Sequence, residues 1–158
     1  MQLKQLFHET DFLIGLNPTD KWDAIGKMME HLVEVGRCSA EQADTLHEAV
    51  LARERSMSTG MERGIAIPHA AVDGIEHVIA SIGIVSRPHG LAFESVDGRP
   101  TQVVVLFLIP RAQKLLHIRT LADVARVLGR EAVRDALLTA TSWAEAWHAL
   151  AEGEAAAT

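Results

Sequence analysis

The sequence predicts a single-domain α/β sandwich, in which helices cover both faces of a mixed central β-sheet. Two observations carry this prediction. Segments with helical apolar spacing flank a central group of short strand-like runs, and these runs are apolar on both sides. Strands of that kind belong in the middle of a sheet that is covered on both faces. Because strands and helices do not alternate strictly, we expect a mixed rather than a wholly parallel sheet.

The first third of the chain predicts two helices. From residue 17 to about residue 36 apolar residues recur at helical spacing, and Asn17 or Thr19 is a candidate cap. The apolar face of this helix comprises Trp22, Ile25, Met29 and Leu32. Ser39-Ala40-Glu41-Gln42 has the pattern of a capping box, which predicts a second helix that runs to about Arg53.

The middle of the chain predicts a loop and three strands. Residues 58–64 are small and polar and include two glycines, so we expect a loop there. Strand-like runs follow at residues 65–67, 78–85 and 103–109, and residues 97–100 between the last two have the composition of a turn. The order of the strands in the sheet stays open.

Helices resume near Leu115, and Gly129 stands where that helix should end. Residues 131–140 predict a further helix, and Ser142-Trp143-Ala144-Glu145 predicts the capping box of the last one. Trp22, Trp143 and Trp147 fall on helix faces and are expected in the core. We expect one domain over residues 1–151 and a flexible tail over residues 152–158, where Gly and Ala alternate with acidic residues.

Composition excludes several classes of function. The formal charge of the 158 residues is −6, and Lys and Arg form no basic stripe, which argues against a nucleic-acid or anionic-membrane surface. Cys38 is the only cysteine, so no internal disulfide can form. The N-terminus lacks an apolar signal core, and the longest apolar run is too short to span a bilayer. A cytoplasmic protein without direct membrane insertion is therefore expected.

The segment from Arg53 to His69 concentrates the groups that can do chemistry. The loop supplies backbone N–H groups and the hydroxyls of Ser58 and Thr59, which can bind an anion, and Arg53 can offset phosphate charge. Neutral imidazole is a good nucleophile near pH 7. Taken alone, however, a histidine beside a proline is more often a strand-end residue, and Gly60 with its neighbours could serve only the turn.

The whole segment is more specific than its parts. Ser58-Thr59-Gly60 and the downstream Gly64-Ile65-Ala66-Ile67-Pro68-His69 resemble the active-site signature of enzyme IIA domains of the fructose/mannitol class. These domains belong to the phosphoenolpyruvate-dependent sugar phosphotransferase system, and nitrogen-regulatory relatives share the signature. Leu51-Ala52-Arg53-Glu54 resembles the end of a helix in that family, and residues 103–110 resemble its central strand. His117-Ile118-Arg119-Thr120-Leu121 resembles its segment with a second active-site histidine.

The resemblance implies roles for these residues. His69 would accept a phosphoryl group on Nε2 from a phosphorylated histidine carrier protein, and His117 would lie beside it. Arg53, Ser58, Thr59 and Gly60 would support the phosphoryl group. No metal or cofactor is implied. An apolar rim would dock the donor, with Met57, Met61 and Ala70 as plausible contributors.

The acceptor stays open between two branches of the family. A regulatory protein would act on target proteins, whereas a transport component would pass the group to a IIB domain associated with a sugar permease. We favour the regulatory, nitrogen-type branch, because the chain stands alone without a fused transporter or carrier domain and its motif resembles that branch at least as well.

Two departures from the family pattern leave other readings open. Glu62 and Arg63 occupy a stretch where the family has a further glycine and often an asparagine, and Ala70-Ala71 replaces a common Gly-Lys. An acid near a phosphate would repel it, so an unphosphorylated protein-interaction module is one alternative. A small-ligand domain using a His69–His117 cleft is another. The remaining histidines show no metal-ligand spacing: His8, His31, His47, His77, His89 and His148.

Overall fold

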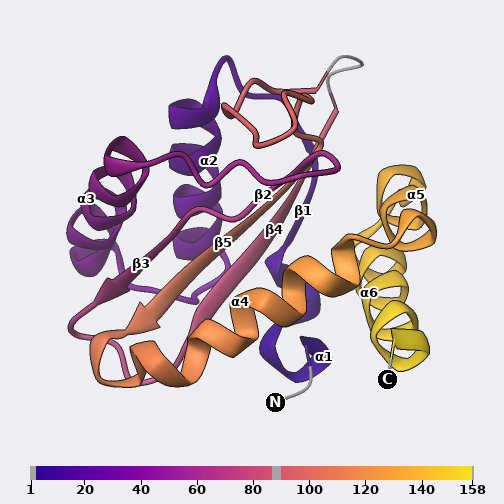
Figure 1. Ribbon diagram of the computed structural model, residues 1–158. Helices are drawn as coiled ribbons and strands as arrows, with labels where there is room; N and C mark the ends of the chain where they lie inside the picture. The colour runs from indigo at the N-terminus through magenta and orange to yellow at the C-terminus, as the bar shows by residue number, and fades with distance from the viewer. Residues whose placement is uncertain (1–2, 87–89, 158) are drawn as a thin grey trace.

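The computed structural model describes residues 3–86 and 90–157, and its layers are those of an α/β sandwich. In Figure 1, α2 and α3 lie on one side of the sheet and α4, α5 and α6 on the other. The elements are α1 (Leu3–Leu6), the 3-10 turn η1 (Glu9–Asp11), β1 (Phe12–Leu16), α2 (Lys21–Glu34), α3 (Ala40–Ser56), β2 (Ile65–Ala66), β3 (His69–Val72), β4 (Ile79–Val85), β5 (Val103–Pro110), the 3-10 turn η2 (Arg111–Gln113), α4 (Lys114–Leu128), α5 (Glu131–Thr139) and α6 (Trp143–Ala157).

The sheet is mixed, as the sequence predicts. Its strand order is β1-β4-β5-β2. β3 also pairs with β5: β2 pairs with the start of β5, at Val103 and Val104, and β3 pairs with its end, from Phe107 to Pro110. β4 and β5 are antiparallel, whereas β1 runs parallel to β4, and β2 and β3 run parallel to β5. His89, one of the histidines considered above, lies outside the described residues.

β5 is the centre of the sheet, and all eight of its residues are buried. Its side chains alternate between two cores. Val103, Val105, Phe107 and Ile109 pack with α1, α4, α5 and α6, whereas Val104, Leu106 and Leu108 pack with α2 and α3. A strand that faces helices on both sides must be apolar throughout, which is why its sequence shows no polar alternation.

The helix caps decide where the helices begin. Ser39 and Ser142 accept hydrogen bonds from the backbone N–H groups of Gln42 and Glu145, each at 3.2 Å, which confirms both predicted caps. The first predicted helix begins later than expected, at Lys21, because Asp20 rather than Asn17 or Thr19 caps it.

Two strands are missing from the sequence prediction. β1 is short and contains Gly15 with a positive φ of 75°, and both features weaken the strand pattern. β3 is rich in alanine, which has low strand propensity, and it is a strand because it pairs with β5. His69 therefore begins a strand rather than following the end of one.

Two of the three tryptophans are not core residues. The side chains of Trp22 and Trp143 are exposed, in contrast to the sequence prediction. Trp22 lies in the first turn of α2, where its ring contacts the ammonium of Lys21, 4.9 Å from the ring centroid. Trp147 is half-buried and donates its indole N–H to the carbonyl of Phe7 at 3.1 Å.

The expected tail is helical as far as the structure describes it, since α6 continues through Ala157. Its packing explains this correction. The carboxylate of Glu154 accepts a hydrogen bond from the backbone N–H of Leu3 at 2.5 Å, and Arg130 donates to the carbonyl of Gly153 at 3.2 Å. The described helices include none that is both long and apolar enough to cross a bilayer.

We predict that Gly153→Ala destabilises the protein, although alanine normally stabilises a helix interior by about 1 kcal/mol relative to glycine. A Cβ at this position would lie 2.4 Å from Val133 Cγ2, so the gain is opposed by an overpacking cost of about 1–3 kcal/mol. Chemical denaturation measures the difference, with the exposed Glu152→Ala as control. A more stable Gly153→Ala variant would show that α6 does not pack against α5 as described.

Candidate functional site

His69 is held at the start of β3 by the chain on either side of it. The carbonyl of the preceding Pro68 accepts a hydrogen bond from the N–H of Phe107 at 3.0 Å, and His69 itself is opposite Phe107 in the register of β3 with β5. The imidazole is half-buried. The ring is therefore fixed by the central strand and still open on one side.

One hydrogen bond assigns the proton of the ring. Nδ1 of His69 lies 2.8 Å from the carbonyl oxygen of Ile67. A carbonyl oxygen only accepts, so Nδ1 carries the proton and Nε2 of the neutral ring keeps its lone pair. In this tautomer Nε2 is the ring nitrogen that is free to act as a nucleophile.

The electrostatic surroundings keep the ring neutral. Burial lowers the pKa of His69, the hydrogen bond to Ile67 opposes that shift, and the positive charges of Arg53 and Lys114 lower the pKa further, against the negative charge of Glu54. A neutral ring at pH 7 is the form that can act as a nucleophile.

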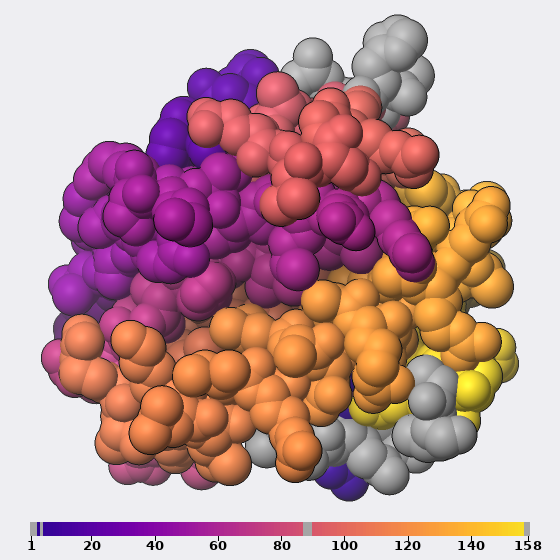
Figure 2. Space-filling view, in the orientation of Figure 1, coloured from indigo at the N-terminus to yellow at the C-terminus, as the bar shows by residue number. Residues whose placement is uncertain are grey.

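A cavity of about 320 Å³ lies at His69, and we call it the His69 cavity. Five of the six predicted site residues line it: Arg53, Ser58, Thr59, Gly60 and His69. They come from the end of α3, the loop after it and the start of β3. The rest of the lining is apolar or uncharged and includes Met61, Ile67, Val96, Leu121, Ala122 and Ala125. Figure 2 shows this face of the molecule, where the segment near residue 60 lies between α4 and the segment of residues 90–100.

Both hydroxyls of residues 58–60, which we call the 58–60 loop, and the N–H groups of Thr59 and Gly60 are already engaged. Both the N–H and the hydroxyl of Thr59 donate to the buried carboxylate of Glu54. The hydroxyl of Ser58 donates to the carbonyl of Phe93, and its oxygen accepts from the N–H of Gly60 at 3.2 Å. In this arrangement the loop forms a wall of the cavity that is held by hydrogen bonds to Glu54 and Phe93. The sequence analysis did not identify Glu54 as a residue that holds the loop.

Arg53 is the cationic side chain of the His69 cavity. One of its terminal nitrogens donates to the carbonyl of Met57 at 2.8 Å, which ties the guanidinium to the end of its own helix. A guanidinium has five N–H donors, so this bond leaves further donors for an anion in the cavity.

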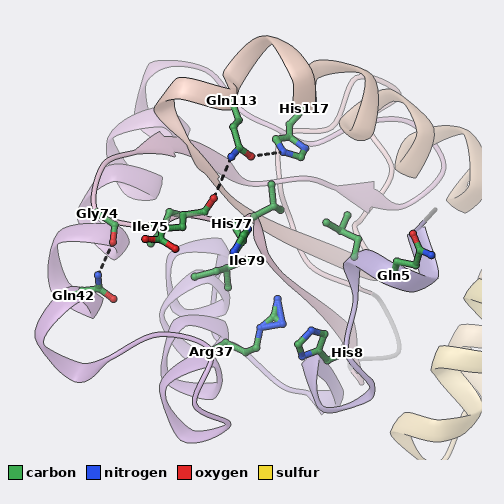
Figure 3. A pocket seen from close by; sticks show the side chains of 13 residues that line it. Gln5, His8, Arg37, Gln42, Gly74, Ile75, His77, Ile79, Gln113 and His117 are labelled. Atoms are coloured by element: carbon green, nitrogen blue, oxygen red, sulfur yellow. Dashed lines mark hydrogen bonds between the residues drawn. The ribbon is translucent and has the colours of Figure 1, made fainter. Parts of the chain in front are cut away.

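His117 lies in a different cavity, of about 560 Å³, and the structure does not bring it to the His69 cavity. Its ring is buried, with Nε2 at 3.1 Å from Gln113 Oε1 and Nδ1 at 3.2 Å from Thr120 Oγ1. Figure 3 shows Gln113 between His117 and the β3–β4 connection, where its amide nitrogen donates to the carbonyl of Glu76 at 3.1 Å. Burial lowers the pKa of His117.

Comparison with known proteins identifies the family of this chain. Residues 5–153 match the family described as "Phosphoenolpyruvate-dependent sugar phosphotransferase system, EIIA 2". The chain belongs to this family. This match confirms the resemblance that the signature around His69 indicates.

Curated relatives fall into both branches of the family. The chain is 31% identical to the fructose-specific EIIA component of Haloferax volcanii over 135 residues, covering 85% of each protein. It is 36% identical to the nitrogen regulatory protein of Pseudomonas aeruginosa over 98 residues, covering 62% of each. It is 30% identical to the fructose-specific EIIABC component of Bacillus subtilis over 142 residues, which are 90% of this chain but 22% of that relative.

Solved structures share the fold. The nitrogen regulatory protein IIA-Ntr from Neisseria meningitidis superposes with a TM-score of 0.81 at 22% identity, covering 94% of this chain and 98% of that one. The mannitol enzyme IIA of Escherichia coli, solved in complex with its phosphorylated enzyme IIB, gives a TM-score of 0.73 at 24% identity, covering 93% and 97%. The single-layer sheet with helices on both faces is thus the fold of this EIIA family.

The departures from the family pattern lie beside the His69 cavity. Glu62 and Arg63 line a neighbouring cavity of about 500 Å³ rather than that of His69. Arg63 has a positive φ of 64°, and its conformation is held from both ends. Its N–H donates to Asp97 Oδ2 at 2.9 Å, and its guanidinium donates to the carbonyl of Gly129, the C-cap of α4, at 2.7 Å.

Exposed apolar side chains gather near the His69 cavity. Met61 and Val96 line it, and Val96 is 76% exposed. Met57 is exposed as well, whereas Ala70 is 5% exposed and lies in the core beneath α3. Ala70 is therefore not part of an apolar rim, because β3 turns that side chain inward. The described residues contain no cluster of three or more His, Cys, Asp or Glu placed to hold a metal ion.

We predict that His69 titrates below the ordinary histidine pKa of about 6.5. Its folded pKa is lowered, so between about pH 6.5 and that folded value the unfolded chain binds more protons, and the protein loses stability as the pH falls through this window. Following the ring proton signals by NMR against pH measures the midpoint. A midpoint at or above about 6.5 would contradict the burial and charge environment described here.

Proposed function

We propose that this protein is phosphorylated on Nε2 of His69 by a phosphorylated histidine carrier protein and passes the phosphoryl group to an acceptor protein. The observation that carries the proposal is the bond from Nδ1 to the Ile67 carbonyl, which leaves Nε2 as the free nitrogen of a neutral ring. The lone pair of Nε2 forms the new N–P bond as the N–P bond of the donor breaks. The electron pair of that bond returns to the donor ring, so the transfer needs no metal and no net proton.

Arg53 is the residue best placed to meet the charge of the phosphoryl group. It lines the His69 cavity, and its positive charge acts on the His69 ring. Phosphoryl transfer depends on positioning and on charge stabilisation at the equatorial oxygens, which a guanidinium supplies through several donors. Because both hydroxyls of the 58–60 loop and the N–H groups of Thr59 and Gly60 are engaged, we assign Ser58, Thr59 and Gly60 to the wall that places the phosphoryl group.

His117 has a more distant role in this proposal. A contact with the phosphoryl group would require its bonds to Gln113 and Thr120 to break, since both ring nitrogens are engaged. It lies one helical turn before Leu121, which lines the His69 cavity. We therefore propose that His117 supports the site by fixing this turn of α4.

The exposed apolar side chains around the cavity fit a protein donor. Leu115 and Leu116 in the first turn of α4 are 83% and 67% exposed, and Lys114 beside them is close enough to act on His69 by charge. Exposed apolar groups around a reacting residue are typical of a surface that a partner covers transiently. We propose that Met57, Met61 and the start of α4 contact the carrier protein.

For the acceptor, we propose a regulatory target of the nitrogen-type branch and cytoplasmic action. The signature around His69 and relatives such as the Pseudomonas aeruginosa nitrogen regulatory protein support this choice. A sugar-transport role is the second candidate, because the fructose-specific relative is similar over a longer stretch and the mannitol enzyme IIA of similar fold binds a phosphorylated IIB.

The proposal predicts a single acid-labile phosphate after incubation with phosphoenolpyruvate, enzyme I and the histidine carrier protein. Intact mass spectrometry measures the adduct. His69→Ala abolishes it, because no other residue supplies the nucleophile, and Arg53→Ala slows its formation by about 10²-fold through lost charge stabilisation. His148→Ala, a change at an exposed histidine of α6, is the matched control and leaves the rate unchanged.

Two outcomes would overturn the proposal. Failure of the wild-type protein to gain phosphate from a cognate donor would favour an unphosphorylated interaction module. A phosphate that persists in His69→Ala would place the chemistry at another residue.

A further inference from the structure

A buried ion pair lies behind the 58–60 loop. The ammonium of Lys21, in the first turn of α2, is 3.1 Å from the carboxylate of Glu54, near the end of α3. Their side chains are 8% and 0% exposed. Burying two opposite charges costs a desolvation penalty that their attraction often does no more than offset, so stability alone gives a weak reason for such a pair.

The carboxylate of this pair is bound to the loop. The N–H of Thr59 donates to both oxygens of Glu54, at 3.1 and 3.2 Å, and the Thr59 hydroxyl donates to Oε2 at 2.5 Å. Hydrogen bonds to an ionised acceptor are stronger and shorter than those between neutral groups. Thr59 is thus fixed from behind by a group whose charge Lys21 stabilises.

The front of the loop is fixed by residues 93–95. The hydroxyl of Ser58 donates to the carbonyl of Phe93. Gly60 packs so closely on the same segment that a Cβ would lie 2.6 Å from that carbonyl oxygen. Lys21 reaches this side as well, with its ammonium 3.6 Å from Glu94 Oε1 and 5.7 Å from the centroid of the Phe93 ring. One ammonium therefore contacts the supports on both sides of the loop.

We infer that Lys21 and Glu54 are positioning residues, which set the 58–60 loop against the phosphoryl group at His69; this inference rests on the proposed function. The pair does so without touching the reacting atoms. Glu54 fixes Thr59, and the ammonium of Lys21 offsets the negative charge of Glu54, which would otherwise repel a phosphoryl dianion. A misplacement of about 1 Å in such a wall can cost about 10²-fold in rate.

The test separates positioning from stability. Glu54→Gln alone leaves the buried ammonium with only the exposed carboxylate of Glu94, 3.6 Å away, and is expected to destabilise the protein. The double variant Lys21→Met/Glu54→Gln removes both charges, and thermal unfolding checks that it remains folded. We expect phosphorylation at saturating carrier protein to slow by about 10-fold or more, with the KM for the carrier protein unchanged, because the docking surface is intact.

A second variant and a matched control complete the experiment. Thr59→Val keeps the shape of the side chain and the backbone N–H bonds to Glu54 but removes the hydroxyl bond to Glu54, and it is expected to slow the same step. Asp11→Asn/Arg37→Met removes a second largely buried ion pair, whose atoms are 3.1 Å apart and which lines none of the His69 cavity. This control is expected to keep the wild-type rate.

The two levels of the proposal fail differently. If the wild-type protein is phosphorylated and the folded double variant reacts at the same rate, the pair is only structural and the inference is overturned. A parallel loss of rate in the Asp11→Asn/Arg37→Met control would overturn it too, since it would show a general effect of removing a buried pair. If the wild-type protein gains no phosphate, the proposed function itself fails.

Discussion

The hydrogen bond from His69 Nδ1 to the Ile67 carbonyl is the constraint on which the proposed phosphoryl transfer depends. It couples the tautomer of the ring to the backbone two residues upstream, so the fold determines which ring nitrogen keeps its lone pair. That backbone is in turn fixed by β5, which pairs with β2 before Ile67 and with β3 from His69 onward. A buried, fully apolar strand thus sets the orientation of the half-buried imidazole.

The surroundings of the ring come from three parts of the chain that the fold brings together. The end of α3 supplies a guanidinium, the loop after it supplies a wall, and α4 supplies an apolar cover. The loop is held between Glu54 and Phe93 rather than being free to wrap an anion. This favours a site in which side chains such as Arg53 neutralise the charge of a bound anion, whereas the loop fixes the position of that anion.

Sequence reasoning could find the parts of this structure that are local. The caps at Ser39 and Ser142 follow from their own tetrapeptides, and the apolar run of β5 follows from its burial on both faces. β3 could not be found, because its alanines form a strand only through pairing with β5. The role of Glu54 could not be predicted either, because the sequence around an acidic residue near a helix end does not show that it is buried. Its partner Lys21 lies 33 positions upstream, and only the fold brings the two side chains together. For His117, the sequence motif could be recognised but the orientation of the side chain could not. That orientation depends on the hydrogen bonds of the ring to Gln113 and Thr120.

The most direct measurement is the position of the phosphate on the ring. Long-range ¹H–¹⁵N NMR of the phosphorylated protein distinguishes the two nitrogens of each histidine. The structure predicts phosphorus on Nε2 of His69, with Nδ1 still protonated and bonded to the Ile67 carbonyl. Phosphorus on Nδ1 of His69, or on any other histidine, would contradict the account.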